Sequence, residues 1–277
     1  MPGEYCSKSC RRADKGGTDS RSSSCTPRPG SVPPSLSRPI SSISRKFEPT
    51  QLSTTDQDYI DILNQCTKSW SGTIKMPKID AIWNVTNPAL RAKYELYCSQ
   101  DGLRDASVYG HGKNPGNRQR RMHGSMMTHK FDGTVCTVGG CKVCCIMRNG
   151  FNMQYVQKGC FFGHGIYSTA SFSTACRYAK KKGSSVFCGA VLICSVACGS
   201  AELIDGATLS KTTHLVDSPQ PPNFHSRVID APHKSKSYQQ LAAQHGGPLL
   251  ESVDEIVVFH DDAICPSFLV VFEDTGK

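Results

Sequence analysis

The sequence predicts a protein of the α+β class, and three observations support this class. Helical patterns are few, the stretches that resemble strands are short, and the two do not alternate as in a doubly wound parallel sheet. We see no internal repeat. The chain of 277 residues is long enough for one large domain with a proper hydrophobic core.

The first fifty residues differ in composition from the rest of the chain. They contain twelve Ser and seven Pro and almost no large apolar side chains. Such a segment buries too little surface to offset the entropy that it would lose on ordering. We therefore expect a disordered, Ser/Pro-rich basic tail over residues 1–50 and a folded domain over residues 51–277.

Two helices and a strand are expected at the start of the folded domain. Asp56–Trp70 has acidic residues at its beginning and apolar residues at helical spacing, which predicts a helix. Ile79–Val85 alternates and predicts a strand. A second helix is expected to begin at Asn87-Pro88, because proline is favoured in a first helical turn.

The rest of the domain is expected to consist of strands, one helix and two long loops. Residues 101–120 are rich in Gly, Asn and Arg and predict a surface loop, and residues 205–250 are polar and irregular, as in a functional loop. Ser171 or Ser173 is a suitable cap for a helix running to Ala179. Three apolar runs predict buried strands: Val186–Val196, Glu255–Phe259 and Ser267–Phe272.

Charge and cysteine content indicate the surroundings of the protein. The net charge is +9, of which the first fifty residues contribute +5, so the folded part is only mildly basic; this suits an anionic ligand and is weak evidence for nucleic acid. Fifteen irregularly spaced cysteines argue against a disulfide framework. We expect a reducing location, cytoplasmic or nuclear, without a membrane segment, and a monomer.

Three segments contain residues suited to chemistry. His123-Gly124-Ser125 places a histidine beside a glycine, where backbone can approach a ligand closely. Gly159, Gly163 and Gly165 precede Tyr167, as in a loop that wraps a ligand. Each of these segments also has a purely structural interpretation.

The third segment contains the carboxylate of Glu255, and a second tyrosine, Tyr178, follows Tyr167 in the second segment. Tyr167 and Tyr178 are eleven residues apart, so a loop tyrosine and a helix tyrosine could form a slot for a planar ring, or both could be core. Glu255 enters an apolar strand, where a carboxylate acts as an electrostatic or general-base group; the alternative is an exposed strand end.

A cysteine cluster follows the histidine segment. His129, Cys136, Cys141 and Cys144 have the spacing His-x6-Cys-x4-Cys-x2-Cys, which suits tetrahedral zinc in an insert over residues 126–146. Cys145 and Cys160 are alternative ligands, and three buried or free thiols are the competing interpretation. A structural zinc ion here would steady the loop between the histidine and tyrosine segments.

Together the segments resemble the catalytic domain of the poly(ADP-ribose) polymerases, the diphtheria-toxin-like branch of the ADP-ribosyltransferases. That family carries a His, Tyr, Glu trio on successive strands, which His123, Tyr167 and Glu255 match. The resemblance covers about residues 55–275, and the cysteine cluster makes the chain most similar in style to stand-alone fungal members. It implies an ADP-ribosyltransferase fold of two packed, mainly antiparallel β-sheets with flanking helices.

The resemblance also implies an activity, transfer of ADP-ribose from NAD+, and a role for each matching residue. Glu255 is expected to bind the 2′-hydroxyl of the nicotinamide ribose and to stabilise an oxocarbenium-like transition state. His123 would bind a ribose hydroxyl, the Gly124 backbone the carboxamide, and Tyr167 and Tyr178 the nicotinamide ring. Ala175 stands where many members have a serine, so Ser125 or Ser173 is expected to supply that hydroxyl.

Several functional questions stay open at this point. The acceptor is a protein side chain, a nucleic-acid end or water, and one unit or a polymer is added. A catalytically inactive module that binds NAD or ADP-ribose is the main alternative function. RNA 2′-phosphotransfer on the same fold ranks last, because no set of Arg and His surrounds the trio.

Overall fold

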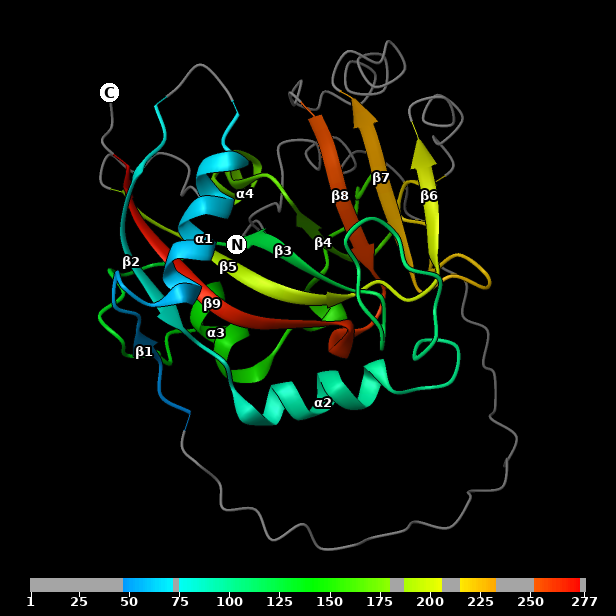
Figure 1. The fold of residues 1–277 in the computed structure, drawn as a ribbon, viewed down its shortest axis with the longest axis horizontal. Helices are drawn as coiled ribbons and strands as arrows, with labels where there is room; N and C mark the ends of the chain where they lie inside the picture. Colours follow the sequence, from blue (N-terminus) through cyan, green and yellow to red (C-terminus); the bar gives the residue numbers. More distant parts are fainter. Residues whose placement is uncertain (1–46, 72–74, 180–186, 206–214, 233–251, 275–277) are drawn as a thin grey trace, which may run out of the picture.

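The computed structural model describes residues 47–71, 75–179, 187–205, 215–232 and 252–274, whose arrangement is drawn in Figure 1. Within these ranges there are four α-helices: α1 (Gln57–Lys68), α2 (Pro88–Cys98), α3 (Lys142–Asn149) and α4 (Phe172–Ala179). Two 3₁₀ turns cover Met153–Tyr155 and Asp261–Ala263. The strands are β1 (Thr50–Gln51), β2 (Lys78–Asn84), β3 (Arg118–Gly124), β4 (Ile166–Thr169), β5 (Phe187–Ala197), β6 (Ala201–Asp205), β7 (Ser226–Pro232), β8 (Ser252–Val258) and β9 (Ile264–Asp274).

These strands form one sheet in the order β1-β2-β9-β5-β3-β4-β8-β7-β6. Neighbours run antiparallel except for the parallel pair β6–β7. The α+β class is confirmed, but the expectation of two packed sheets is wrong. Only Met122 and Thr169 are register partners between β3 and β4 in the described chain, and this contact joins the two halves.

The two halves of the sheet differ in direction. Figure 1 shows β6, β7 and β8 running steeply against β3, β5 and β9. Strand twist accumulates across a sheet, so a short connecting strand such as β4 can join halves of very different orientation. Strands β3 and β4 therefore pair only over a short length at the place where the two halves meet.

Helices cover both faces of the larger half. Helices α1 and α4 enclose a core cluster on one face that includes Met122, Val191 and Phe272. Helices α2 and α3 enclose the cluster on the other face, which includes Leu192 and Leu269. Adjacent residues of β5, such as Val191 and Leu192, enter opposite clusters because successive side chains of a strand point to opposite faces.

The two predicted N-terminal helices are confirmed with small shifts at their ends. The helix expected over Asp56–Trp70 spans Gln57–Lys68. The second begins at Pro88, and the Asn87 side chain accepts a hydrogen bond from the Ala89 amide at 3.1 Å. An Asn cap followed by Pro satisfies one amide and removes another, which explains why this boundary is sharp.

Three other expectations need correction or lie partly outside the described residues. The loop predicted over residues 101–120 ends at Arg118, where β3 begins. The loop predicted over residues 205–250 contains β7; residues 206–214 and 233–251 are outside the described ranges. Residues 1–46 of the predicted tail are also outside them, whereas Phe47 packs against the core.

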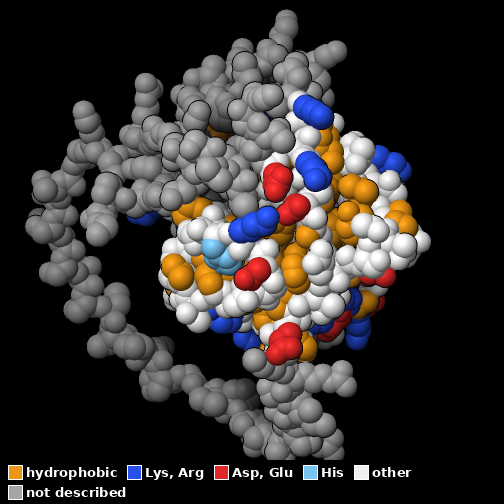
Figure 2. Space-filling view, turned by 90° about the vertical axis from the view of Figure 1, so that its left-hand side faces the viewer, with side chains coloured by type: hydrophobic (Ala, Val, Ile, Leu, Met, Phe, Trp, Pro, Cys, Tyr) orange, Lys and Arg blue, Asp and Glu red, His pale blue; other side chains and the backbone are white. Residues whose placement is uncertain are grey.

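The charges on one face and the lengths of the helices are relevant to binding of nucleic acid and to insertion in a membrane. Figure 2 looks onto the side where β1 and β2 lie in Figure 1, and there Lys/Arg and Asp/Glu side chains are interspersed with hydrophobic ones. Among the described residues drawn there, the Lys and Arg side chains do not form the continuous basic stripe that is typical of nucleic-acid binding. Among the described residues, every helix is too short or too polar to cross a membrane.

Candidate functional site

The three residues expected to form the trio lie on three neighbouring strands. His123 is on β3, Tyr167 on β4 and Glu255 on β8, and these strands are adjacent in the sheet. Thr169 is the register partner of both Met122 and Glu255, so the three strands are aligned within two residues of the trio. Chain segments 132 residues apart in sequence (255 − 123) therefore meet at one point of the sheet.

His123 is held by its neighbour in the trio. Its Nδ1 atom lies 2.8 Å from the Tyr167 carbonyl oxygen. A carbonyl only accepts, so Nδ1 carries the proton and Nε2 is the accepting nitrogen of the neutral ring. Burial lowers the pKa of His123 despite the hydrogen bond to Tyr167, and Lys142 lowers it further. The Phe151 ring packs edge-on at a centroid distance of 4.9 Å and fixes the plane of the imidazole.

Glu255 is a buried carboxylate with a raised proton affinity. It is 7% exposed, and burial, followed by the charge of Asp254, raises its pKa to about 7. In a poorly hydrated site, a negative charge acts strongly on a developing positive charge. Glu255 is thus suited to electrostatic stabilisation of a cation near neutral pH.

The neighbour of Glu255 is itself paired. The Arg121 guanidinium donates to the Asp254 carboxylate at 2.6 Å. Arg121 is two residues before His123 on β3, and its side chain is 9% exposed. The ion pair fastens β3 to β8 beside the trio. Neither Arg121 nor Asp254 is indicated as a partner by sequence spacing, since 133 residues separate them.

The hydroxyl of Tyr167 is fixed by two hydrogen bonds. It donates to the Gly163 carbonyl at 3.0 Å and accepts from the Phe162 amide at 2.9 Å. Burial raises its pKa well above the usual value, and Cys160 and Glu255 add to the effect, so the phenol stays neutral. The ring is therefore a rigid, uncharged platform.

Tyr178 approaches from α4, because this helix packs closely on β3. A side chain at Gly124 would collide with the Ala175 carbonyl and would lie 3.0 Å from Tyr178 Cβ. Tyr178 is 38% exposed and is among the weaker influences that raise the pKa of Tyr167, after burial. The absence of a side chain at Gly124 thus lets α4, which carries Tyr178, pack closely against β3.

The two serines expected at the site have different surroundings. The Ser173 hydroxyl lies 2.9 Å from both the Ser71 and Ser171 hydroxyls, in a chain of three that is buried at Ser171 and Ser173. Ser125 follows β3 directly and is 8% exposed. Ala175 belongs to α4 and is fully buried in the core that this helix covers. A hydroxyl role for Ser125 or Ser173 stays a prediction, and Ser173 would have to exchange one of its present partners.

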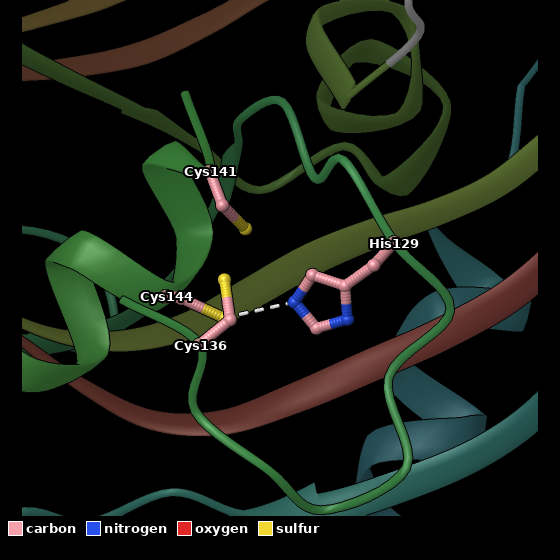
Figure 3. Close-up of side chains that lie close together, drawn as sticks. All are labelled: His129, Cys136, Cys141 and Cys144. Atoms are coloured by element: carbon pink, nitrogen blue, oxygen red, sulfur yellow. Dashed lines mark hydrogen bonds between the residues drawn. The ribbon is translucent and has the colours of Figure 1, made fainter. Parts of the chain in front are cut away.

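The four residues expected to bind metal form one cluster, drawn in Figure 3. Their ligand atoms all lie within 4.8 Å of one another: His129, Cys136, Cys141 and Cys144. His129 and Cys136 lie in the loop after β3, Cys141 caps α3, and Cys144 is in the first turn of α3. Neither Cys145 nor Cys160, the expected alternatives, belongs to this group of described residues.

The chemistry of the cluster fits zinc. Ligand atoms bound to tetrahedral zinc are about 3.5–3.8 Å apart, and His129 Nε2 lies 3.3 Å from Cys144 Sγ. His129 Nδ1 lies 2.9 Å from the Lys130 carbonyl, which leaves Nε2 without the proton, as a ligand nitrogen requires. A hydrogen bond from Cys144 lowers the pKa of Cys141, so one thiolate is already favoured.

The cluster is connected to the histidine by short paths. The Val143 amide donates to the Met126 carbonyl at 3.3 Å, which ties α3 to the end of β3. The Asn87 side chain donates to the carbonyls of Met147 and Arg148, at the other end of α3. Phe151 follows this helix and packs against His123. The helix that begins at the cluster is thus connected to Phe151, which packs beside the imidazole.

Two comparisons with known proteins bear on this site. A family model described as the poly(ADP-ribose) polymerase catalytic domain matches residues 56–274. The match spans all three strands of the trio, the cysteine cluster and α4. A comparison of the chain with curated proteins gave no match.

Proposed function

Since the chain belongs to the poly(ADP-ribose) polymerase catalytic-domain family, we propose that it cleaves the nicotinamide–ribose bond of NAD+ and transfers ADP-ribose to a macromolecular acceptor. The observation that carries the proposal is the buried carboxylate of Glu255, which lies on the strand next to that of Tyr167. The Tyr167 carbonyl in turn accepts a hydrogen bond from His123.

Binding of NAD+ would use the groups around the diverging ends of β3 and β4. The planar nicotinamide ring would lie between the rings of Tyr167 and Tyr178 and be attracted to both by offset or parallel stacking. The Gly124 backbone contacts the carboxamide at a position that lacks a side chain. His123, protonated on Nδ1, would accept a hydrogen bond from a ribose hydroxyl at Nε2.

Bond cleavage would use Glu255. As nicotinamide leaves as a neutral molecule, positive charge develops on the ribose ring, as in glycoside hydrolysis. The Glu255 carboxylate accepts the 2′-hydroxyl and stabilises this charge, and no strong acid is needed for the leaving group. The acceptor nucleophile then forms a bond to the ribose carbon that nicotinamide has left, and its proton is released to solvent. Glu255 is compatible with addition of one unit or of a polymer.

The test is release of nicotinamide from labelled NAD+. Glu255→Gln and His123→Ala should each lower kcat/KM by about 100-fold or more, because both lose contacts with the reacting ribose. Glu273→Gln is the matched control, an exposed glutamate on β9, and should retain activity. Full activity in both site variants would refute the assignment.

A binding module without turnover is the second candidate function. The observation that favours it is Ala175, whose buried methyl occupies the position of a serine in many family members. Calorimetry distinguishes the two. NAD+ binding by the wild-type chain without nicotinamide release, at any acceptor tested, would favour the module.

We also propose that the cysteine cluster holds a structural zinc ion through His129, Cys136, Cys141 and Cys144. A four-ligand site of three thiolates and one imidazole leaves no open position for catalysis, so the ion would support folding only. Elemental analysis of the purified chain should give about one zinc per molecule. A zinc content well below one would refute the proposal.

A further inference from the structure

A row of four residues crosses the smaller half of the sheet. Tyr167 on β4 is the register partner of Val257 on β8, Val257 of Arg227 on β7, and Arg227 of Glu202 on β6. Residues directly opposite one another on adjacent strands share a face of the sheet. Arg227 and the tyrosine of the trio therefore lie on the same face, two strands apart.

Arg227 is almost completely buried and uses its guanidinium in several directions. Nε donates to the Glu202 carboxylate at 2.6 Å, while Nη1 donates to the Phe162 carbonyl at 3.0 Å and to the Ser218 hydroxyl at 2.8 Å. Its guanidinium carbon lies 5.4 Å from the centre of the Phe259 ring. Its side chain is 4% exposed. Only the planar fork of arginine serves such divergent acceptors at once.

The segment held by Arg227 is the one that holds Tyr167. The Tyr167 hydroxyl binds the Phe162 amide and the Gly163 carbonyl, whereas Arg227 binds the Phe162 carbonyl between them. Two consecutive residues are thus fixed by the tyrosine and by the arginine. A displacement of this segment changes the position of the phenol, since both hydroxyl contacts move with it.

The contact leaves no room for a side chain. Gly163 has φ +111°, and a side chain there would collide with the Arg227 guanidinium. A second attachment holds the start of the same loop: the Asp217 carboxylate accepts from the amides of Gly159 and Cys160, both at 2.9 Å or less. The loop is therefore fixed at its start by Asp217 and at its middle by Arg227.

We infer that Arg227 is a positioning residue for nicotinamide binding, which acts by holding the Phe162–Gly163 segment against the Tyr167 hydroxyl. The inference rests on the proposed function and deepens it. Arg227 does not touch the dinucleotide itself. It fixes the orientation of the ring on which nicotinamide stacks, and a small misplacement of such a group lowers the rate strongly.

The experiment compares Arg227→Lys with Arg118→Lys. Lysine keeps the charge beside Glu202 but cannot reach the divergent acceptors together. Arg118 is a matched control away from the trio: it pairs with Glu95, donates to the Pro115 carbonyl and lies 5.6 Å from the Tyr94 ring centre. Ser218→Ala is a milder second variant, which removes one acceptor and no charge.

Steady-state kinetics separate positioning from stability. In Arg227→Lys the KM for NAD+ and the inhibition constant of nicotinamide should rise together, by about 10-fold to 100-fold. Ser218→Ala should raise both by about fivefold, the equivalent of one lost hydrogen bond. Arg118→Lys should leave both unchanged. A variant that merely loses folded protein lowers kcat at constant KM, and that result for Arg227→Lys would overturn the inference.

Hydrogen exchange gives a readout independent of turnover. The Phe162 amide is protected by the Tyr167 hydroxyl, so exchange in residues 159–165 should be faster in Arg227→Lys than in wild type or Arg118→Lys. Unchanged exchange there also overturns the inference. If wild-type protein releases no nicotinamide, the proposed function fails; if it does and Arg227→Lys matches it, only the positioning role fails.

Discussion

The Arg121 guanidinium donates to the Asp254 carboxylate at 2.6 Å, and this contact ties β3 directly to β8 although β4 lies between them in the sheet. The connection is possible because β4 ends at Thr169, the partner of both Met122 and Glu255, so that Arg121 and Asp254 lie one position beyond the end of β4. The pair places one negative charge beside the buried Glu255, and Arg121 partly compensates it.

Asp254→Asn should shift the acid limb of the pH–activity profile to lower pH. Burial is the main cause of the raised pKa of Glu255, about 7, and the Asp254 charge is the second. Removal of that charge makes ionisation of Glu255 easier, so the active carboxylate persists to lower pH. The profile of kcat/KM against pH, which reports the free enzyme, measures the shift. Asp101→Asn, at an exposed loop aspartate, should leave it unchanged; a coincident profile for Asp254→Asn contradicts the coupling.

Glu255→Gln should make the protein more stable at pH 8 while it strongly lowers the rate of transfer. The folded-state pKa is about 7 and the usual value 4.5, so ionisation of this group costs the folded state on the order of 3 kcal/mol above pH 7. Below about pH 4 both states are protonated and the difference vanishes. Urea unfolding at pH 4 and pH 8 tests this.

The control for that measurement is Glu273→Gln, which changes an exposed glutamate on β9. It should show the same free energy of unfolding relative to wild type at both pH values. If Glu255→Gln behaves in the same pH-independent way, the carboxylate is hydrated in the folded protein, and its burial is not the cause of its chemistry.

Gly124→Ala should weaken both stability and nicotinamide binding. The added methyl would collide with the Ala175 carbonyl, so α4 must move away from β3 and carry Tyr178 with it. Overpacking of this kind costs about 1–3 kcal/mol. Gly139→Ala is the matched control, because no atom lies within 4 Å of a methyl at that position. Melting temperature and the KM for NAD+ should change in the first variant only; an unchanged KM for Gly124→Ala would separate Tyr178 from binding.

Elements with a strong local signal could be predicted from the sequence. The start of helix α2 is indicated by Asn87-Pro88. The Asn87 side chain accepts a hydrogen bond from one amide of the first turn, and Pro88 has no amide hydrogen, so neither effect needs the rest of the fold. Strands β5 and β9 are long apolar runs at the centre of the sheet. Each member of the predicted trio lies in a distinctive segment of its own, and the fold places these segments on adjacent strands.

Features that depend on long-range partners could not be predicted. Strand β7 has a polar beginning, and its strand conformation is stabilised by pairing with β6 and β8. Helix α3 is short, and its buried residues include Cys144. In the sequence, the spacing of this cysteine indicates a metal ligand and gives no sign of a helix. Arg227 meets Phe162 across 65 residues, and no local pattern specifies such a partner.

Removal of zinc should destabilise the wall beside His123 before it affects the rest of the sheet. Cys144→Ser should lower the zinc content and the melting temperature, because metal-binding energy at a structural site is folding energy. Cys145→Ser is the adjacent control, since Cys145 is outside the cluster and contacts the Asn149 side chain. A chelator should reproduce the effect in wild type and in Cys145→Ser. Faster exchange in residues 142–151 of the chelated protein, with β5 still protected, would place the loss at α3 and Phe151; equal melting temperatures for the two cysteine variants would contradict a structural role of the metal.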